Sequence, residues 1–332
     1  MQMKKLLSGI VVSAVIAVML TITAQNAVAE NRTLRSADTH EGDYPTVKAV
    51  EYMGGLIKER SSGRYDIKVF HSRQLGEEKD TIEMVELGAL DLARTSLSPF
   101  NDLVTESRVL TLPFLFRSVE HYHNVLDGEV GQTILGAFAA HGFIGLAYYD
   151  SGARSFYTVN KPIAALEDLK GLRIRVQDSD LIASTMEALG ALPMKMPFGQ
   201  VDTALRTGLI DAAENNWPSY YVTGHYKAAP FYSLSRHLMV PEVLVMSKKI
   251  WDTLSADDQV MIRNAAKESS IYMRKLWAEQ VAEAKEKLEK ANVTITEIKD
   301  LTPFQNAVGN VYDKYADTPE LKKLVEMIKN TK

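Results

Sequence analysis

The sequence predicts an α/β protein of two domains, on three observations. Short apolar stretches alternate with amphipathic helical stretches along most of the chain, a pattern typical of strand–helix–strand units with parallel strands. The length of 332 residues favours more than one domain. A helical stretch of more than 30 residues at 255–291 would reach about 45 Å. A domain of about 120 residues has a radius of gyration near 14 Å, so we expect this helix to cross both domains.

The first half of the chain is expected to begin with strand–helix alternation. Residues 65–70 alternate apolar and polar side chains, as a half-buried strand does. The acids Glu77 and Glu78 suit the positive N-terminus of a helix. We expect strands at 33–37, 65–70, 90–95 and 142–149, and helices at 44–60, 76–87 and 119–140.

The second half is expected to continue in the same way. We expect strands at 154–160, 172–177, 210–213 and 242–246, and helices at 180–189, 201–208 and 255–291. Ser255 and Asp258 make a capping box for the last of these helices. A coiled coil is the alternative for it, but a regular heptad repeat is missing.

Residues 1–29 have the pattern of a secretory signal peptide. Lys4 and Lys5 precede an apolar run at 6–20, and Ala27 and Ala29 make a small-x-small cleavage site. The run is shorter than the roughly 20 residues of a membrane span, which favours cleavage over an uncleaved anchor. Cleavage leaves 332 − 29 = 303 residues and changes the net charge from −4 to −6, because two lysines are lost. In a bacterium the mature protein is expected in the periplasm.

Composition and motifs exclude several classes of function. The chain has no cysteine, so thiol catalysis, disulfides and thiolate metal sites are excluded. The balance of 38 basic and 42 acidic residues argues against nucleic acid as a partner. Phosphate-binding, dinucleotide, hydrolase and zinc-protease motifs are absent from the sequence. His121 and His123 do not face each other at a helix start. We therefore expect no catalytic residue, no metal and no cofactor.

Three arginines stand near strand ends, where open α/β sheets bind ligands. They are Arg94, Arg154 and Arg175. Arg175 stands near the end of a strictly alternating strand whose polar face also carries Arg173, further back, and Gln177. A guanidinium grips a carboxylate with two parallel hydrogen bonds. The pattern therefore indicates an anion site, and surface ion pairs are the alternative.

Asn215, Asn216 and Trp217 follow the strand at 210–213. Two amides and a flat aromatic face suit a ligand with several hydroxyl groups. The alternative is a capped loop with a packed tryptophan.

Six segments, in this order and spacing, resemble the substrate-binding proteins of TRAP transporters, the tripartite ATP-independent periplasmic carriers. The segments are SRQLGE at 72–77, LPFLF at 112–116, DLKGLRIRV at 168–176, MPFGQV at 196–201, ALRTG at 204–208 and DAAEN at 211–215. The resemblance extends from about residue 33 to residue 326.

The resemblance implies the two-domain periplasmic binding protein fold, with a ligand cleft between the domains and a long bracing helix. We expect a signal peptide at 1–29, a first α/β domain at 31–152 plus part of 244–280, a second α/β domain at 153–243, a helix spanning both at 255–291, and a C-terminal helical segment at 292–332. Ligand binding would close the domains about a hinge, a motion known for periplasmic binding proteins.

The resemblance also implies the ligand contacts. Arg175 falls on the arginine that pairs with the substrate carboxylate, Asn215 on its supporting amide, and Arg154 on a frequent second arginine. Phe198 falls on a pocket-lining position, and loops of the first domain supply polar contacts. The full expected set is Arg175, Asn215, Arg154, His40, Glu78, Arg94, Gln177, Asn216, Phe198 and Trp217.

Four further segments resemble the branch that binds hexuronates such as glucuronate and galacturonate. They are RSAD at 35–38, DSGARSFY at 150–157, ENNWPSY at 214–220 and PEVLVM at 241–246. The implied partners are a hexuronate and the small and large membrane subunits of a TRAP permease.

Other readings remain open from the sequence. The ligand could be an aldonate, or a 2-oxo acid bound through a cation near Gln177, Trp217 and Glu242. The chain could be a periplasmic uronate sensor subunit. A glycosidase would need a carboxylate pair, such as Glu78 with Glu242.

Overall fold

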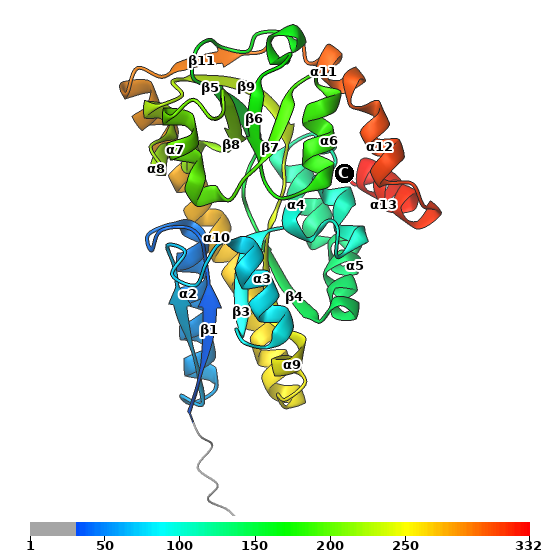
Figure 1. Ribbon diagram of the computed structural model, residues 1–332. Helices are drawn as coiled ribbons and strands as arrows, with labels where there is room; N and C mark the ends of the chain where they lie inside the picture. The colour runs from blue at the N-terminus through cyan, green and yellow to red at the C-terminus, as the bar shows by residue number, and fades with distance from the viewer. Residues whose placement is uncertain (1–30) are drawn as a thin grey trace, which may run out of the picture.

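The computed structural model describes residues 31–332, so the predicted signal peptide lies outside the described residues. Figure 1 shows two lobes, each built on one β-sheet, with the helix α10 (Ala256–Lys290) behind them. Within residues 31–332, no helix is long and apolar enough to cross a membrane. The predicted α/β class with a long bracing helix is confirmed.

Lobe 1 contains a mixed sheet of five strands. Their order across the sheet is β2 (Tyr65–Phe70), β1 (Arg32–Ala37), β3 (Leu92–Ser96), β10 (Glu242–Ser247) and β4 (Phe143–Tyr149). β1 lies parallel to β2 and β3, as the strand–helix–strand pattern predicts. β10 returns from the second half of the chain and lies antiparallel between β3 and β4.

Lobe 2 contains a mixed sheet of six strands. Their order is β11 (Thr294–Glu297), β9 (Phe231–Leu238), β5 (Arg154–Thr158), β8 (Ala212–Asn215), β6 (Arg173–Val176) and β7 (Leu192–Lys195). The strands β7, β9 and β11 were not among the predicted strands. The segment 292–332, expected as helical, therefore begins with a strand that pairs with β9. β7 and β11 are edge strands of four residues with no fully buried side chain, so they lack an apolar pattern.

Helices cover both sheets and form the right-hand side of the molecule in Figure 1. Besides α10 they are α2 (Pro45–Arg60), α3 (Glu78–Leu87), α4 (Val119–Asp127), α5 (Glu129–Ala137), α6 (Asp180–Ala188), α7 (Val201–Arg206), α8 (Trp217–Val222), α9 (Lys248–Trp251), α11 (Thr302–Ala307), α12 (Gly309–Tyr315) and α13 (Pro319–Asn330).

The single helix predicted at 119–140 is two helices in the structure. The chain is extended at Gly128, between α4 and α5. A side chain at Gly131 would lie 2.0 Å from the carbonyl oxygen of Leu126. Glycine at this position therefore permits the close approach of the two helices.

Helix α10 braces the two lobes. It has 35 residues, and the Oγ of Ser255 caps it by accepting from the backbone N–H of Asp258. α10 packs against α2 and β4 of lobe 1 and against α8 of lobe 2. Its buried Trp277 lies beside Gly152, which has a φ of +60° where the chain crosses from β4 to β5. A crossing point held against the bracing helix can act as a hinge.

Candidate ligand-binding site

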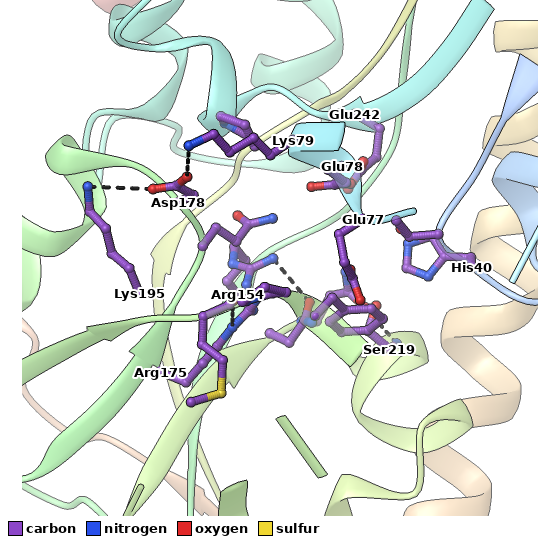
Figure 2. A pocket seen from close by; sticks show the side chains of 18 residues that line it. His40, Glu77, Glu78, Lys79, Arg154, Arg175, Asp178, Lys195, Ser219 and Glu242 are labelled. Atoms are coloured by element: carbon purple, nitrogen blue, oxygen red, sulfur yellow. Dashed lines mark hydrogen bonds and ion pairs between the residues drawn. The ribbon is translucent and has the colours of Figure 1, made fainter. Parts of the chain in front are cut away.

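A cavity of about 200 Å³ lies between the two lobes. Figure 2 shows side chains from both lobes pointing into it. Eight of the ten predicted residues line it: Arg175, Asn215, Arg154, His40, Glu78, Gln177, Asn216 and Phe198. Arg94 and Trp217 are not among the lining residues.

Arg175 stands on β6 and is almost completely buried, at 4% exposure. Its Nε donates to the carbonyl oxygen of Met196 at 2.9 Å. Among residues 31–332, no carboxylate lies within 4.0 Å of its guanidinium. Burial lowers the pKa of Arg175, and the neighbouring Arg154 also lowers it. Because arginine keeps its proton in proteins, the cavity contains a buried cation that forms no ion pair with a carboxylate of the described residues.

Arg154, at the start of β5, is neutralised by Glu214. Its Nε and Nη2 both donate to the Glu214 carboxylate, and its Nη1 donates to Asn215 Oδ1 at 3.1 Å. Burial raises the pKa of Glu214, but Arg154 and His237 outweigh this effect and lower it to about 2. Arg154 is thus an ion-pair partner of Glu214 and orients the Asn215 amide. The sequence pattern alone could not distinguish this paired arginine from a free cation.

Arg94, on β3, is enclosed by three carboxyl groups. It forms ion pairs with Asp38, Glu78 and Glu242, and its side chain has no exposed surface. Glu78 and Glu242 line the cavity in front of it. Arg94 therefore lies behind the cavity wall, where it holds the carboxyl groups that a ligand can reach.

His40 and Phe198 form the aromatic part of the wall. The His40 ring stacks on Tyr44 at a centroid distance of 3.9 Å and meets Phe198 edge-on at 5.5 Å. Burial lowers the pKa of His40 to about 3, and Arg94 acts in the same direction. His40 is therefore a neutral donor or acceptor at neutral pH.

Residues 215–217 connect β8 to α8, and both interpretations of their sequence hold in part. Asn216 caps α8 by accepting from the backbone N–H of Ser219, and it also lines the cavity. Trp217 packs on Tyr232, with a centroid distance of 4.4 Å. The tryptophan is thus packed within lobe 2 and is not on the cavity wall.

The two lobes contact each other around the cavity. Gln177 Oε1 accepts from the Ser98 hydroxyl at 2.9 Å, and the Glu77 carboxylate accepts from the backbone N–H of Gly199 at 3.1 Å. The hydroxyl groups of Tyr44 and Ser219 lie 2.9 Å apart. These bonds from lobe 1 to lobe 2 describe a closed cleft.

Ten lining residues were outside the predicted set, among them Lys195, Met196, Ser219 and Lys79. Lys195 and Met196 end and follow the unpredicted strand β7, and Ser219 lies in the unpredicted helix α8. Lys79 directly follows the predicted contact Glu78 on α3, so the same comparison with the family could have predicted it.

Neither histidine of the 121–123 pair is placed for a metal. His121 Nε2 bonds to the carbonyl oxygen of Ile328, and His123 Nε2 bonds to the Asp150 carboxylate at 2.8 Å. Within residues 31–332, no group of three or more His, Asp or Glu residues could hold a metal ion.

Two lobes that close on a buried, unpaired cation define a solute receptor of the cleft type. The chain belongs to the DctP family of solute-binding proteins, described as bacterial extracellular solute-binding protein, family 7, which matches residues 36–318. This is the TRAP family that the sequence motifs resemble, so the resemblance is confirmed.

Solved structures and a curated relative resemble the chain over almost all its length. A TRAP periplasmic solute-binding protein from Bradyrhizobium, in complex with galacturonate, is 51% identical with a TM-score of 0.89, covering 90% of this chain and 100% of that one. One from Roseobacter denitrificans, with bound β-D-glucuronate, is 40% identical with a TM-score of 0.88, covering 91% and 100%. A solute-binding protein of Chromohalobacter salexigens is 36% identical, covering 98% of this chain and 97% of its own length.

Proposed function

We propose that this chain is the periplasmic receptor of a TRAP transporter and that it binds a hexuronate, either galacturonate or glucuronate. One observation carries the proposal: Arg175 is a buried cation that forms no ion pair with a carboxylate of residues 31–332, and it lines a cavity of about 200 Å³ between the lobes. Bringing a ligand carboxylate to this guanidinium supplies the missing charge. The uronates in the galacturonate and glucuronate complexes of similar proteins support the ligand class.

The bound uronate spans the cavity from one lobe to the other. Its carboxylate pairs with Arg175 and accepts from the Asn215 amide that Arg154 orients. Its hydroxyl groups donate to Glu78 and exchange hydrogen bonds with His40, Gln177 and Asn216, the other polar members of the predicted set. One face of the sugar ring packs against Phe198.

Binding to both lobes closes the cleft, because a ligand shifts a conformational equilibrium only through contacts that differ between its states. The closed receptor then docks on the small and large membrane subunits of the permease. Cleavage after residue 29 releases the mature chain into the periplasm. The receptor makes and breaks no covalent bond of its ligand.

Two observations favour a uronate receptor over a glycosidase and over a receptor for a cation-bound 2-oxo acid. Glu78 and Glu242 both accept from the Nη1 of Arg94 and lie on the same side of the cavity in Figure 2, whereas the carboxyl groups of a glycosidase flank the bond that is cleaved. Trp217, which would stand near a cation-bound 2-oxo acid, packs on Tyr232 away from the cavity wall.

Titration calorimetry of the mature chain with galacturonate and glucuronate tests the proposal. Arg175→Ala removes the buried cation and leaves a desolvated ligand carboxylate unpaired, which costs about 3–5 kcal/mol. We expect an affinity loss of more than about 100-fold. Arg173→Ala is the matched control, because Arg173 lies on the same strand but pairs with Asp211 at the surface. Its affinity should stay within about twofold of the unmodified chain, since exposed ion pairs contribute little. Unchanged affinity in Arg175→Ala would contradict the carboxylate assignment.

A further inference from the structure

The cavity wall formed by lobe 1 is rich in carboxyl groups. Arg94 Nη1 donates to Glu78 at 3.2 Å and to Glu242 at 2.6 Å, while its Nε and Nη2 donate to Asp38. One guanidinium thus faces three carboxyl groups. If one of the three is protonated, two carboxylates still face one guanidinium. This wall is therefore negative in either state.

Part of this negative wall is open to the ligand. The side chains of Glu78 and Glu242 are 17% and 7% exposed, and both line the cavity. Glu78 Oε1 accepts from Arg94 and from the backbone N–H of Ser96. Within residues 31–332, the second oxygen of each carboxyl group, Glu78 Oε2 and Glu242 Oε1, accepts no hydrogen bond. These two oxygens are free acceptors for hydroxyl groups.

The other charged side chains of the cavity are already paired. Arg154 pairs with Glu214, and Lys79 and Lys195 both lie within 4.0 Å of Asp178 at the mouth. His40 is neutral because its pKa is lowered to about 3. Arg175, which Figure 2 places below the cavity while Glu78 and Glu242 lie above it, is the cation left for an anionic ligand within the described part of the chain.

We propose that Asp38, Glu78 and Glu242, held by Arg94, make the receptor selective against ligands with a second carboxylate. The cavity accepts a hexuronate, which has one carboxylate for Arg175 and hydroxyl groups for Glu78 and Glu242. It rejects the aldarate of the same length, which presents a carboxylate at both ends. The inference rests on the proposed function, because it assumes that one carboxylate is bound by Arg175.

The selectivity follows from the sign of the groups that meet at this wall. Hydroxyl groups donate charge-assisted hydrogen bonds to carboxylates. A second ligand carboxylate accepts only, and it would meet like charge in a desolvated site, which is strongly unfavourable. Arg94 does not touch the ligand. It is a positioning residue that keeps Glu78 and Glu242 together on the wall.

Galacturonate and galactarate are the matched test pair, because galactarate carries a carboxylate where galacturonate carries its C1 aldehyde or hemiacetal. Calorimetry on the mature chain should give a galactarate affinity at least about 100-fold below that of galacturonate. Glu78→Gln and Glu242→Gln should each reduce this ratio by about tenfold, since the amide keeps an acceptor oxygen and removes the charge. Glu83→Gln, at an exposed position of the same helix α3, is the control and should leave the ratio unchanged.

Each outcome decides between the two proposals. Galactarate binding within tenfold of galacturonate would overturn the selectivity proposal and leave the uronate receptor standing. A ratio unaffected by both Glu78→Gln and Glu242→Gln would overturn it too. If either variant fails to fold, the ratio of galacturonate affinity to galactarate affinity in the unmodified chain still tests the selectivity proposal. Absence of uronate binding to the unmodified chain would overturn the receptor assignment and this inference with it.

Discussion

Three buried arginines around one cavity differ only in their neighbours. Arg94 forms ion pairs with three carboxyl groups, Arg154 with one, and Arg175 with none among residues 31–332. In the sequence all three stand near strand ends, so pattern alone marks them as equivalent anion ligands. The partner carboxylates come from distant segments, at residues 38, 78, 214 and 242. Which arginine is left to bind an anion is therefore decided by tertiary structure.

Glu78 makes the stability of the protein depend on pH. Burial raises the pKa of its carboxyl group to about 7; Arg94 opposes this shift and Glu242 adds to it. From about pH 4.5 to 7 the folded chain keeps a proton that the unfolded chain releases, so this group's contribution to the free energy of unfolding falls as pH rises. Glu78→Gln should remove this dependence. As pH rises from 5 to 8, the free energy of unfolding of the variant should therefore increase by about 1–3 kcal/mol relative to that of the unmodified chain.

Urea unfolding of both chains at pH 5 and pH 8 measures the effect of Glu78→Gln. Glu83→Gln, on the same helix but exposed, should shift stability equally at both pH values. An equal shift for Glu78→Gln would mean that the Glu78 carboxyl group titrates in its ordinary range.

At the scale of elements, periodicity identifies the strands that carry an apolar pattern and misses those that do not. β2 has its predicted bounds, and α10 begins and ends within one residue of the bounds predicted for that helix. β9 carries buried Ser233, Ser235 and His237 in place of an apolar run. Ser233 Oγ accepts from the backbone N–H of Ile163, and Ser235 bonds to His237. The partner of Ser233 is distant in the chain and the bond of Ser235 is to another polar side chain, so the sequence of β9 alone gives no apolar strand signal.

The start of α10 depends on one hydroxyl group. Ser255 Oγ accepts from the backbone N–H of Asp258 and donates to the Asp258 carboxylate. Ser255→Ala should lower the free energy of unfolding by about 1 kcal/mol. Ser255→Thr keeps the capping oxygen and should retain most of the stability. Thermal unfolding of the three chains measures the difference, and equal losses in both variants would show that the hydroxyl group is not what stabilises this end.

At the scale of the whole molecule, the cavity is assembled from segments spread between residues 39 and 242. The family motifs, together with positions inferred next to them, locate eight of its lining residues because motif spacing reflects the shared fold. They do not show which side chains face the ligand and which lie behind the wall. Trp217 is in a motif as clear as that of Asn215, and Arg94 stands near a strand end as Arg175 does, yet neither Trp217 nor Arg94 lines the cavity.

The contacts between the lobes predict how ligand binding changes the shape of the molecule. The hydroxyl groups of Tyr44, at the start of α2, and Ser219, on α8, lie 2.9 Å apart across the cleft. Opening the cleft separates α2 from α8 and breaks this bond. Tyr44→Phe should therefore weaken the closed state by about 0.5–1.5 kcal/mol, which lowers galacturonate affinity by about 2- to 10-fold.

Calorimetry gives this affinity, and small-angle scattering should show that galacturonate reduces the radius of gyration of the unmodified chain. Tyr149→Phe is the control, because the Tyr149 hydroxyl is equally buried and bonds to Ser269 of α10 instead of crossing the cleft. Loss of the Tyr149 hydroxyl group should lower the stability of the protein and leave its ligand affinity unchanged. Equal affinity losses in the two variants would show that Tyr44 acts through general stability. A radius of gyration that galacturonate does not change would contradict closure as the response to the ligand.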